Sequence, residues 1–204
     1  MKPRLTITKP PCRRWSVGLL LGCALTATAS EVPPKSPADS LATIRTKPGL
    51  TVELAVSEPL VASPVAIDFG TDGKLWVVEM ADYPMGLDGN WKPGGRVKFL
   101  TRSRPDGPFD RATLFLDGLP FPTGVMAWRK GVLICAAPDI IYAEDTAGDG
   151  KADIVRKLYT GFETNNYQAR VNSLSLGLDN WVSKRLASVG VDLPGLSWWA
   201  LCER

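Results

Sequence analysis

Short apolar segments alternate with turns rich in aspartate and glycine through the middle of the chain, and one such unit occurs twice. Residues 140–162 read as a strand, an Asp/Gly-rich turn and a second strand that ends at Gly161. Residues 97–119 follow the same plan, and there Asp110 and Gly118 precede their counterparts by 43 residues. A repeat of about 40–50 residues built from short strands is typical of a β-propeller blade. The alternative is two unrelated hairpins with similar turns.

A second recurring unit, a turn followed by an apolar strand, supports the blade interpretation. It occurs at residues 69–78, again at residues 176–182, and in a shorter form at residues 128–134. Asp-Gly and Asp-Asn suit tight turns, and the β-branched and aromatic residues after them suit strands. Each predicted blade therefore opens with a turn and an inner strand, such as residues 75–78, and closes with the Asp-rich hairpin.

The same pattern predicts the fold class. Residues 51–56 alternate as a half-buried strand does, and no amphipathic helix of three turns stands out between residues 51 and 182. We expect an all-β fold of antiparallel β-propeller blades over residues 48–182, with about two to three blades present.

The N-terminal residues 1–29 have the pattern of an export signal. A basic segment precedes an apolar run over residues 15–25, which is too short to span a bilayer. An Ala-Thr-Ala triplet fits cleavage before Ser30. A Leu-Leu-Gly-Cys segment resembles a bacterial lipobox instead, which would place a lipid anchor on Cys23. Both interpretations predict an exported protein of the periplasm or cell envelope, with membrane contact only through Cys23.

The segments that flank the predicted blades differ from them in composition. Residues 30–47 are polar and contain several prolines, which predicts a disordered linker. Residues 183–204 lack any Asp-Gly turn, so we expect a non-homologous tail, frameshifted or disordered. Propellers usually close with four to eight blades, which makes the chain an N-terminal fragment on this interpretation. A genuine short protein with a terminal helix is the alternative.

The amino-acid composition excludes several classes of functional site. The 204 residues include no histidine, which excludes Ser-His-Asp triads, histidine-ligated zinc and c-type haem. The net charge of +3 comes from the leader, because 24 basic residues fall to 19 against 21 acidic ones once residues 1–29 are removed. Nothing in the remaining charge pattern argues for a nucleic-acid partner.

Candidate ligand contacts fall where the predicted inner strands end. Glu79 and Asp82 follow one such strand and precede an insertion that contains Asp88. Loops that leave the inner strands of a propeller line the mouth of its channel, where ligands bind. For Glu79 and Asp82, ligand contact and a plain solvated loop remain equal alternatives, whereas Asp88 is expected to be a solvated loop acid.

A polar run over residues 165–174 precedes the third apolar strand. It concentrates amides and one arginine, among them Gln168, Arg170 and Asn172. We predict that these three side chains bind a ligand. The alternative is that the run caps strand ends and satisfies backbone groups.

The Asp-rich turn offers a calcium interpretation. Asp145, Asp149 and Asp153 occupy positions 1, 5 and 9 of a loop similar to an EF-hand, but Ala147 removes the acid at position 3 and Arg156 stands at position 12. We therefore favour the alternative, an Asp-Gly hairpin turn, over a calcium site.

Five segments together resemble the opening blades of the exported, membrane-bound dehydrogenase family, which is similar to sorbosone and soluble glucose dehydrogenases. The resemblance covers about residues 48–182. The segments are PVAIDFG at 64–70, LWVVEMADYP at 75–84, FLDGLPFPTGV at 115–125, CAAPDI at 135–140 and RVNSLSLGLDNW at 170–181.

The resemblance implies a six-bladed propeller that holds pyrroloquinoline quinone over its channel and oxidises a sugar or an aldose. It implies cofactor contacts by Gln168, Arg170 and Asn172. The chain departs from the family pattern because the catalytic histidine would fall at Ala169 and a cofactor-contacting glutamine near Pro122. We therefore expect an inactive part of a dehydrogenase-like propeller; the alternative is a non-catalytic module outside the cytoplasm that binds carbohydrate or protein.

Overall fold

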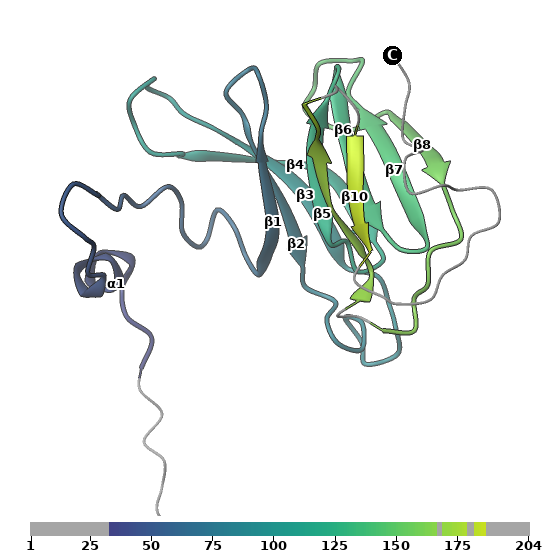
Figure 1. Ribbon diagram of the computed structural model, residues 1–204, viewed down its shortest axis with the longest axis horizontal. Coiled ribbons are helices and arrows are strands. Elements are labelled where there is room, and N and C mark those ends of the chain that lie inside the picture. The colour runs from purple at the N-terminus through teal and green to yellow at the C-terminus, as the bar shows by residue number, and fades with distance from the viewer. Residues whose placement is uncertain (1–32, 167–168, 179–181, 187–204) are drawn as a thin grey trace, which may run out of the picture. The chain divides into compact units, whose positions relative to one another are not determined.

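Ten β-strands and one short helix make up the regular structure of residues 33–166, 169–178 and 182–186, which the computed structural model describes (Figure 1). Among these residues, no helix is long and apolar enough to cross a membrane. The elements are α1 (Pro37–Thr43), β1 (Pro64–Phe69), β2 (Leu75–Met80), β3 (Gly95–Thr101), β4 (Arg111–Leu119), β5 (Gly124–Trp128), β6 (Gly131–Ala136), β7 (Asp139–Glu144), β8 (Ile154–Tyr159), β9 (Val171–Leu176) and β10 (Val182–Leu186).

The strands form two four-stranded sheets and a hairpin, all antiparallel. The first sheet has the order β1-β2-β3-β4, the second has the order β5-β6-β7-β8, and β9 pairs with β10. Each sheet is a meander in which strands adjacent in sequence are also hydrogen-bonded neighbours. The all-β antiparallel class predicted from the sequence is confirmed.

Glycines at equivalent positions of the repeat lie in the left-handed region. Gly118 and Gly161, at the ends of the two closing hairpins, have φ angles of 72° and 98°. Gly73 turns the chain between β1 and β2 with a φ of 80°. A glycine has no Cβ, so it adopts these angles without the steric cost that other residues meet.

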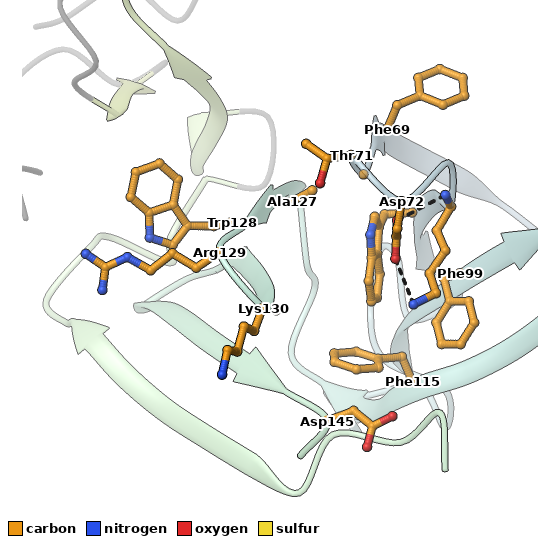
Figure 2. Close-up of a pocket in the computed structure, with 14 residues that line it drawn as sticks. Phe69, Thr71, Asp72, Phe99, Phe115, Ala127, Trp128, Arg129, Lys130 and Asp145 are labelled. Atoms are coloured by element: carbon orange, nitrogen blue, oxygen red, sulfur yellow. Dashed lines mark hydrogen bonds and ion pairs between the residues drawn. The ribbon is translucent and has the colours of Figure 1, made fainter. Parts of the chain in front are cut away.

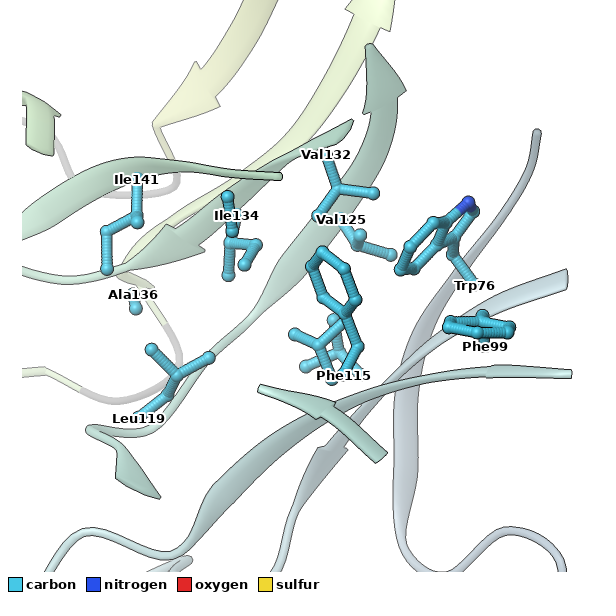
Figure 3. Close-up of a cluster of buried hydrophobic side chains, with 12 residues drawn as sticks. Trp76, Phe99, Phe115, Leu119, Val125, Val132, Ile134, Ala136 and Ile141 are labelled. Carbon is cyan, nitrogen blue, oxygen red and sulfur yellow. The ribbon is translucent and has the colours of Figure 1, made fainter. Parts of the chain in front are cut away.

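The main hydrophobic core lies between the two four-stranded sheets (Figure 3). The first sheet contributes an aromatic cluster, in which the Trp76 ring meets the rings of Phe99 and Phe115 edge-on at centroid distances of 5.3 and 4.8 Å. The second sheet contributes aliphatic side chains such as Val132 and Ile134, both without exposed surface. Each aliphatic side chain buried in this way contributes roughly 1.5–3 kcal/mol.

The outer face of each sheet is also covered in part. Leu75, Val77 and Leu100 on the far face of the first sheet pack against Val61 and Phe109. On the far face of the second sheet, the β9–β10 hairpin covers Met126, Leu133 and Tyr142. The central strands β2 and β6 are thus buried on both faces, which explains why they read as continuous apolar runs.

Two predicted segments near the N-terminus have a different structure. Helix α1 lies within the segment predicted as a disordered linker: Ser36 caps it by accepting the Asp39 N–H at 3.1 Å, and Pro37 occupies the first turn. No residue of the helix is buried. The strand predicted at residues 51–56 is wrong, since the structure has no strand there.

Two predicted boundaries also change. Residues 183–186 belong to β10 and pair with β9, so the tail predicted to begin at residue 183 starts inside a strand. The rest of that tail, residues 187–204, lies outside the described residues, as does the predicted leader. Residues 75–78, predicted as an inner strand, lie in β2, the second strand of its sheet, whereas contacts from sheet to sheet are made mainly by the first strands, β1, β5 and β9.

Candidate functional site

Three connections meet at one end of the sheets, which we call the loop end: residues 81–94 between β2 and β3, residues 120–123 between β4 and β5, and residues 160–170 between β8 and β9. In an antiparallel meander, alternate connections lie at the same end of the sheet. Direct hydrogen bonds tie these connections together: the Phe121 N–H donates to Asp82 at 2.8 Å, and the Thr123 hydroxyl donates at 2.5 Å to the carbonyl of Val171, the first residue of β9. Sequence segments up to 48 residues apart are thereby fixed to one another.

Asp82 is the buried acid at the loop end. Its side chain has no exposed surface, and Oδ2 accepts the N–H groups of Gly94 at 3.2 Å and Phe121 at 2.8 Å. The second oxygen, Oδ1, is buried and has no hydrogen-bond partner among the described residues. A buried carboxylate that is only half satisfied is costly, so Asp82 is held there by its structural role in joining two connections.

Phe121 carries an aromatic and cationic stack beside Asp82. The Arg170 guanidinium lies 4.8 Å from the centroid of the Phe121 ring and is 5% exposed. Arg170 also donates a hydrogen bond to the Thr164 carbonyl at 2.7 Å. Trp91, from the β2–β3 loop, approaches the Phe121 ring at a centroid distance of 6.2 Å. The stack therefore takes one side chain from each connection.

The stack contains strained backbone. Trp91 and Phe121 have φ angles of 67° and 46°, in a region that bulky side chains rarely adopt. Such residues cost about 1–3 kcal/mol each and persist where the surroundings hold them. Trp91 is 51% exposed and Tyr83 of the same loop is also exposed. The loop end thus presents two aromatic side chains to solvent.

Glu79 has a structural role. Its Oε1 accepts the Ala62 N–H at 2.8 Å and forms an ion pair with Lys98 Nζ at 2.8 Å. Lys98 donates in turn to the Leu60 carbonyl at 3.3 Å. Because Glu79 is buried and paired, it fits neither of the two alternatives, a ligand contact or a solvated loop acid. It anchors the segment before β1 to the first sheet.

Asp88 is the solvated loop acid that the sequence predicts. Its Oδ1 accepts the N–H groups of Asn90 at 2.8 Å and Lys92 at 3.2 Å. The hydrogen bond from the Asn90 backbone is the main cause that lowers the pKa of this exposed carboxyl.

Asp139, at the start of β7, is a second buried acid at this end that sequence reasoning missed. Its Oδ2 pairs with Lys157 Nζ at 2.8 Å. Burial alone would raise the pKa of Asp139, but hydrogen bonds from Lys157 and Thr160 and the charge of Lys157 outweigh burial and lower it. The feature of the sequence that could have indicated Asp139 is the Pro-Asp dipeptide directly after a buried strand.

The predicted cofactor residues are only partly brought together. Arg170 is buried in the stack, Asn172 is half-buried on β9 opposite Arg185, and Gln168 lies outside the described residues. Pyrroloquinoline quinone carries several carboxylates and so needs cations that can reach it. Arg170 already donates to the Thr164 carbonyl and Lys157 already pairs with Asp139. The described residues of the predicted contact set therefore give this cofactor no direct support.

The Asp-rich turn lies between β7 and β8, at the other end of the second sheet, and its carboxylates bond to the turn itself. Asp145 accepts the N–H groups of Gly148 at 2.6 Å and Gly150 at 2.8 Å. Asp149 accepts the Lys151 N–H at 2.9 Å.

Asp153, at the end of the same turn, bonds back to residues at its start. It accepts from the N–H and hydroxyl of Thr146 and from the Ala147 N–H. In the part of the chain that the structure describes, no group of three or more acid or cysteine side chains could hold a metal ion. This geometry favours the hairpin-turn interpretation over the calcium site.

A comparison with known protein families matches residues 36–192 to a family described as a domain of unknown function (DUF7133). No curated protein matches the chain. No solved structure matches it either.

Proposed function

The chain belongs to this family of unknown function, and from that premise we propose that it forms blades of a β-propeller whose loop end binds carbohydrate without catalysing a reaction. The repeated architecture supports the propeller. Two consecutive four-stranded meanders pack face to face, and a third begins with the β9–β10 hairpin. The first strands of successive units touch, β1 with β5 and β5 with β9, as the innermost strands of adjacent blades do.

An exposed apolar face on β1 also supports a propeller. Val65, Ile67 and Phe69 point away from the main core and are 48%, 59% and 59% exposed. Alternate residues of a strand point to opposite faces, and those on the other face, such as Ala66, pack against the core between the sheets. In a propeller each blade packs against two neighbours, so this face suits a further blade.

The exposed aromatic side chains of the loop end carry the binding proposal. Trp91 is held in a strained conformation against Phe121, and Tyr83 lies on the same loop. A fixed, exposed aromatic ring offers a flat apolar surface on which the apolar face of a sugar ring packs at low entropic cost. The Trp91–Phe121–Arg170 stack is the single observation on which the proposal depends most.

The absence of suitable catalytic groups favours binding over oxidation. The sequence has no histidine, and Ala169 stands where the resembled dehydrogenases have their base. Asp82, the nearest acid to the stack, is fully buried and engaged by two backbone N–H groups, so it does not reach a bound substrate. The predicted leader places this binding function outside the cytoplasm.

Calorimetric titration of the full chain with neutral oligosaccharides of glucose, galactose and mannose tests the proposal. We expect at least one to bind, and Trp91→Ala to weaken that binding about tenfold, the loss expected when an exposed aromatic contact residue is removed. Phe69→Ala is the matched control, because Phe69 is an exposed aromatic on β1, away from the loop end.

Two outcomes would overturn the proposal. One is that no neutral oligosaccharide binds to the folded chain. The other is that Trp91→Ala leaves the affinity unchanged, or that Phe69→Ala weakens it equally. Reduction of a dye by the chain with pyrroloquinoline quinone and an aldose would instead favour a dehydrogenase.

A further inference from the structure

A cavity opens between the two sheets at the end opposite to the loop end (Figure 2). The β1–β2 turn, the β5–β6 turn and the start of the Asp-rich turn surround it, and its volume is about 280 Å³. Figure 2 shows Asp72 and Phe99 on one side and Arg129 and Lys130 on the other, with Phe115 and Asp145 between them. Ligand sites for drug-sized molecules occupy about 300–1,000 Å³, so this cavity suits a smaller ligand, such as a single sugar ring.

The wall of the cavity contains a hydrogen-bond donor, the indole N–H of Trp76. Trp76 is 6% exposed, and its indole N–H makes no hydrogen bond with any described residue. In Figure 3 the indole nitrogen lies on the side of the ring away from Phe99 and Phe115. An indole N–H is a hydrogen-bond donor only, so it can donate to a ligand atom in the cavity. Thr71, at the rim, adds a hydroxyl that likewise has no partner among described residues.

The charges around the cavity favour an anion. Both carboxylates at the rim are engaged: Asp72 pairs with Lys74 at 2.8 Å, and Asp145 accepts two backbone N–H groups of its own turn. Lys74 is engaged a second time, with its ammonium 5.0 Å from the centroid of the Phe99 ring. Lys130 is exposed and forms no ion pair or hydrogen bond with another described residue. The lining contains three basic side chains, Lys74, Arg129 and Lys130, against two acidic ones, Asp72 and Asp145, which leaves a formal charge of +1.

We propose that this cavity is a second binding site, for a small hydroxylated carboxylate of the size of one sugar ring, such as a hexuronic acid. The carboxylate pairs with Lys130, ring hydroxyls accept from Trp76 and exchange hydrogen bonds with Thr71, and the apolar edge of the ring packs on Phe115. A charge-assisted hydrogen bond is about twice as strong as a neutral one, so Lys130 sets the preference for an acid. This site is independent of the carbohydrate site proposed at the loop end.

Titration of the full chain with glucuronate, glucose and acetate tests the proposal. We expect glucuronate to bind at least about tenfold more tightly than either of the others, because it alone supplies both the charge and the hydroxyls. Lys130→Gln should abolish this preference. Lys151→Gln, in the neighbouring Asp-rich turn but outside the cavity, is the matched control and should leave it unchanged.

Three results would overturn the proposal. Equal binding of acetate and glucuronate would mean adventitious anion binding only, and equal binding of glucose would mean that charge plays no part. An equal effect of Lys151→Gln and Lys130→Gln would mean that general electrostatics explains the affinity. Trp91→Ala distinguishes the two proposed sites, because it should weaken the binding of neutral oligosaccharides and leave the binding of glucuronate unchanged.

Discussion

Asp110 and Asp153 make the same hydrogen bond 43 residues apart in the sequence. The carboxylate of each accepts the backbone N–H of the residue seven positions earlier, Ser103 for the first and Thr146 for the second, both at 3.0 Å. Each thereby fixes the end of a strand to the far side of its turn, once in each four-stranded sheet. The repeat in sequence is thus a repeat of hydrogen bonding as well as of residue type.

The first prediction concerns the stability of the Asp-rich turn. Asp153→Asn should lower the midpoint of thermal unfolding by about 2–4 °C, because it weakens the bonds from Thr146 and Ala147 to a charged acceptor. Asp149→Asn is the control, since Asp149 accepts only the Lys151 N–H among the described residues, and it should change the midpoint by less. Circular dichroism melts compare the two; a larger effect of Asp149→Asn would contradict the proposed role of Asp153.

The same carboxyl should contribute to the pH dependence of stability. Hydrogen bonds from the Thr146 side chain and backbone hold the pKa of Asp153 below its usual value. A lowered folded-state pKa gives stability that is present above the unfolded-state pKa of about 3.9 and is lost as pH falls through the folded-state value. Asp153→Asn should therefore make unfolding less dependent on pH below about 4, as measured by urea unfolding at several pH values.

The second prediction concerns the buried acid of the loop end. Asp82→Ala should lower the free energy of unfolding by at least about 2 kcal/mol, because it leaves the buried N–H groups of Gly94 and Phe121 without an acceptor. Asp88→Ala, in the same loop but exposed, is the control and should cost clearly less. If both variants unfold at the same urea concentration, Asp82 does not join the two connections.

The third prediction concerns alkaline pH. Burial, together with the hydrogen bond to Glu144 and the charge of that group, raises the pKa of Tyr142 to about 12. A raised folded-state pKa gives stability that is complete below the unfolded-state pKa of about 10 and is lost as pH rises from about 10 to 12.

Tyr142→Phe should remove this alkaline loss while it costs about 0.5–1.5 kcal/mol at neutral pH through the lost hydrogen bond. Urea unfolding between pH 7 and about 11 measures both effects. Tyr83→Phe changes an exposed phenol and should leave the alkaline loss intact. A Tyr142→Phe profile parallel to that of the original chain would refute the assignment.

The fourth prediction tests whether β10 is part of the fold. Val182 is buried against Met126, Leu133 and Tyr142, so Val182→Ala should cost about 1–3 kcal/mol of unfolding free energy. Leu178→Ala removes a fully exposed side chain in the turn before β10 and should change stability by less than about 0.5 kcal/mol. Indistinguishable denaturation curves for the two variants would place β10 outside the cooperative fold.

The elements that depend on local pattern were predictable. The Asp-Gly turns, the positive φ of Gly118 and Gly161, and the apolar strands between them follow from the short-range preferences of the backbone. The all-β class and the repeat of 43 residues could be predicted from the sequence, because both closing hairpins have the same order of strand, Asp/Gly-rich turn and strand. Residues 51–56 show the limit of this reasoning, since their alternating pattern finds no partner strand.

The arrangement of the loop end was decided by contacts between distant segments. Glu79 and Asp82 could be selected as candidates from their position after a strand, but only the tertiary structure decided that both are buried and engaged by backbone groups 12 to 39 residues away. Arg170 reaches the ring of Phe121, 49 positions earlier, for the same reason. The sequence by itself determined which segments turn and which extend, because neighbouring residues set those angles. Which polar side chains are removed from water depends on how the sheets pack, and no local pattern encodes that.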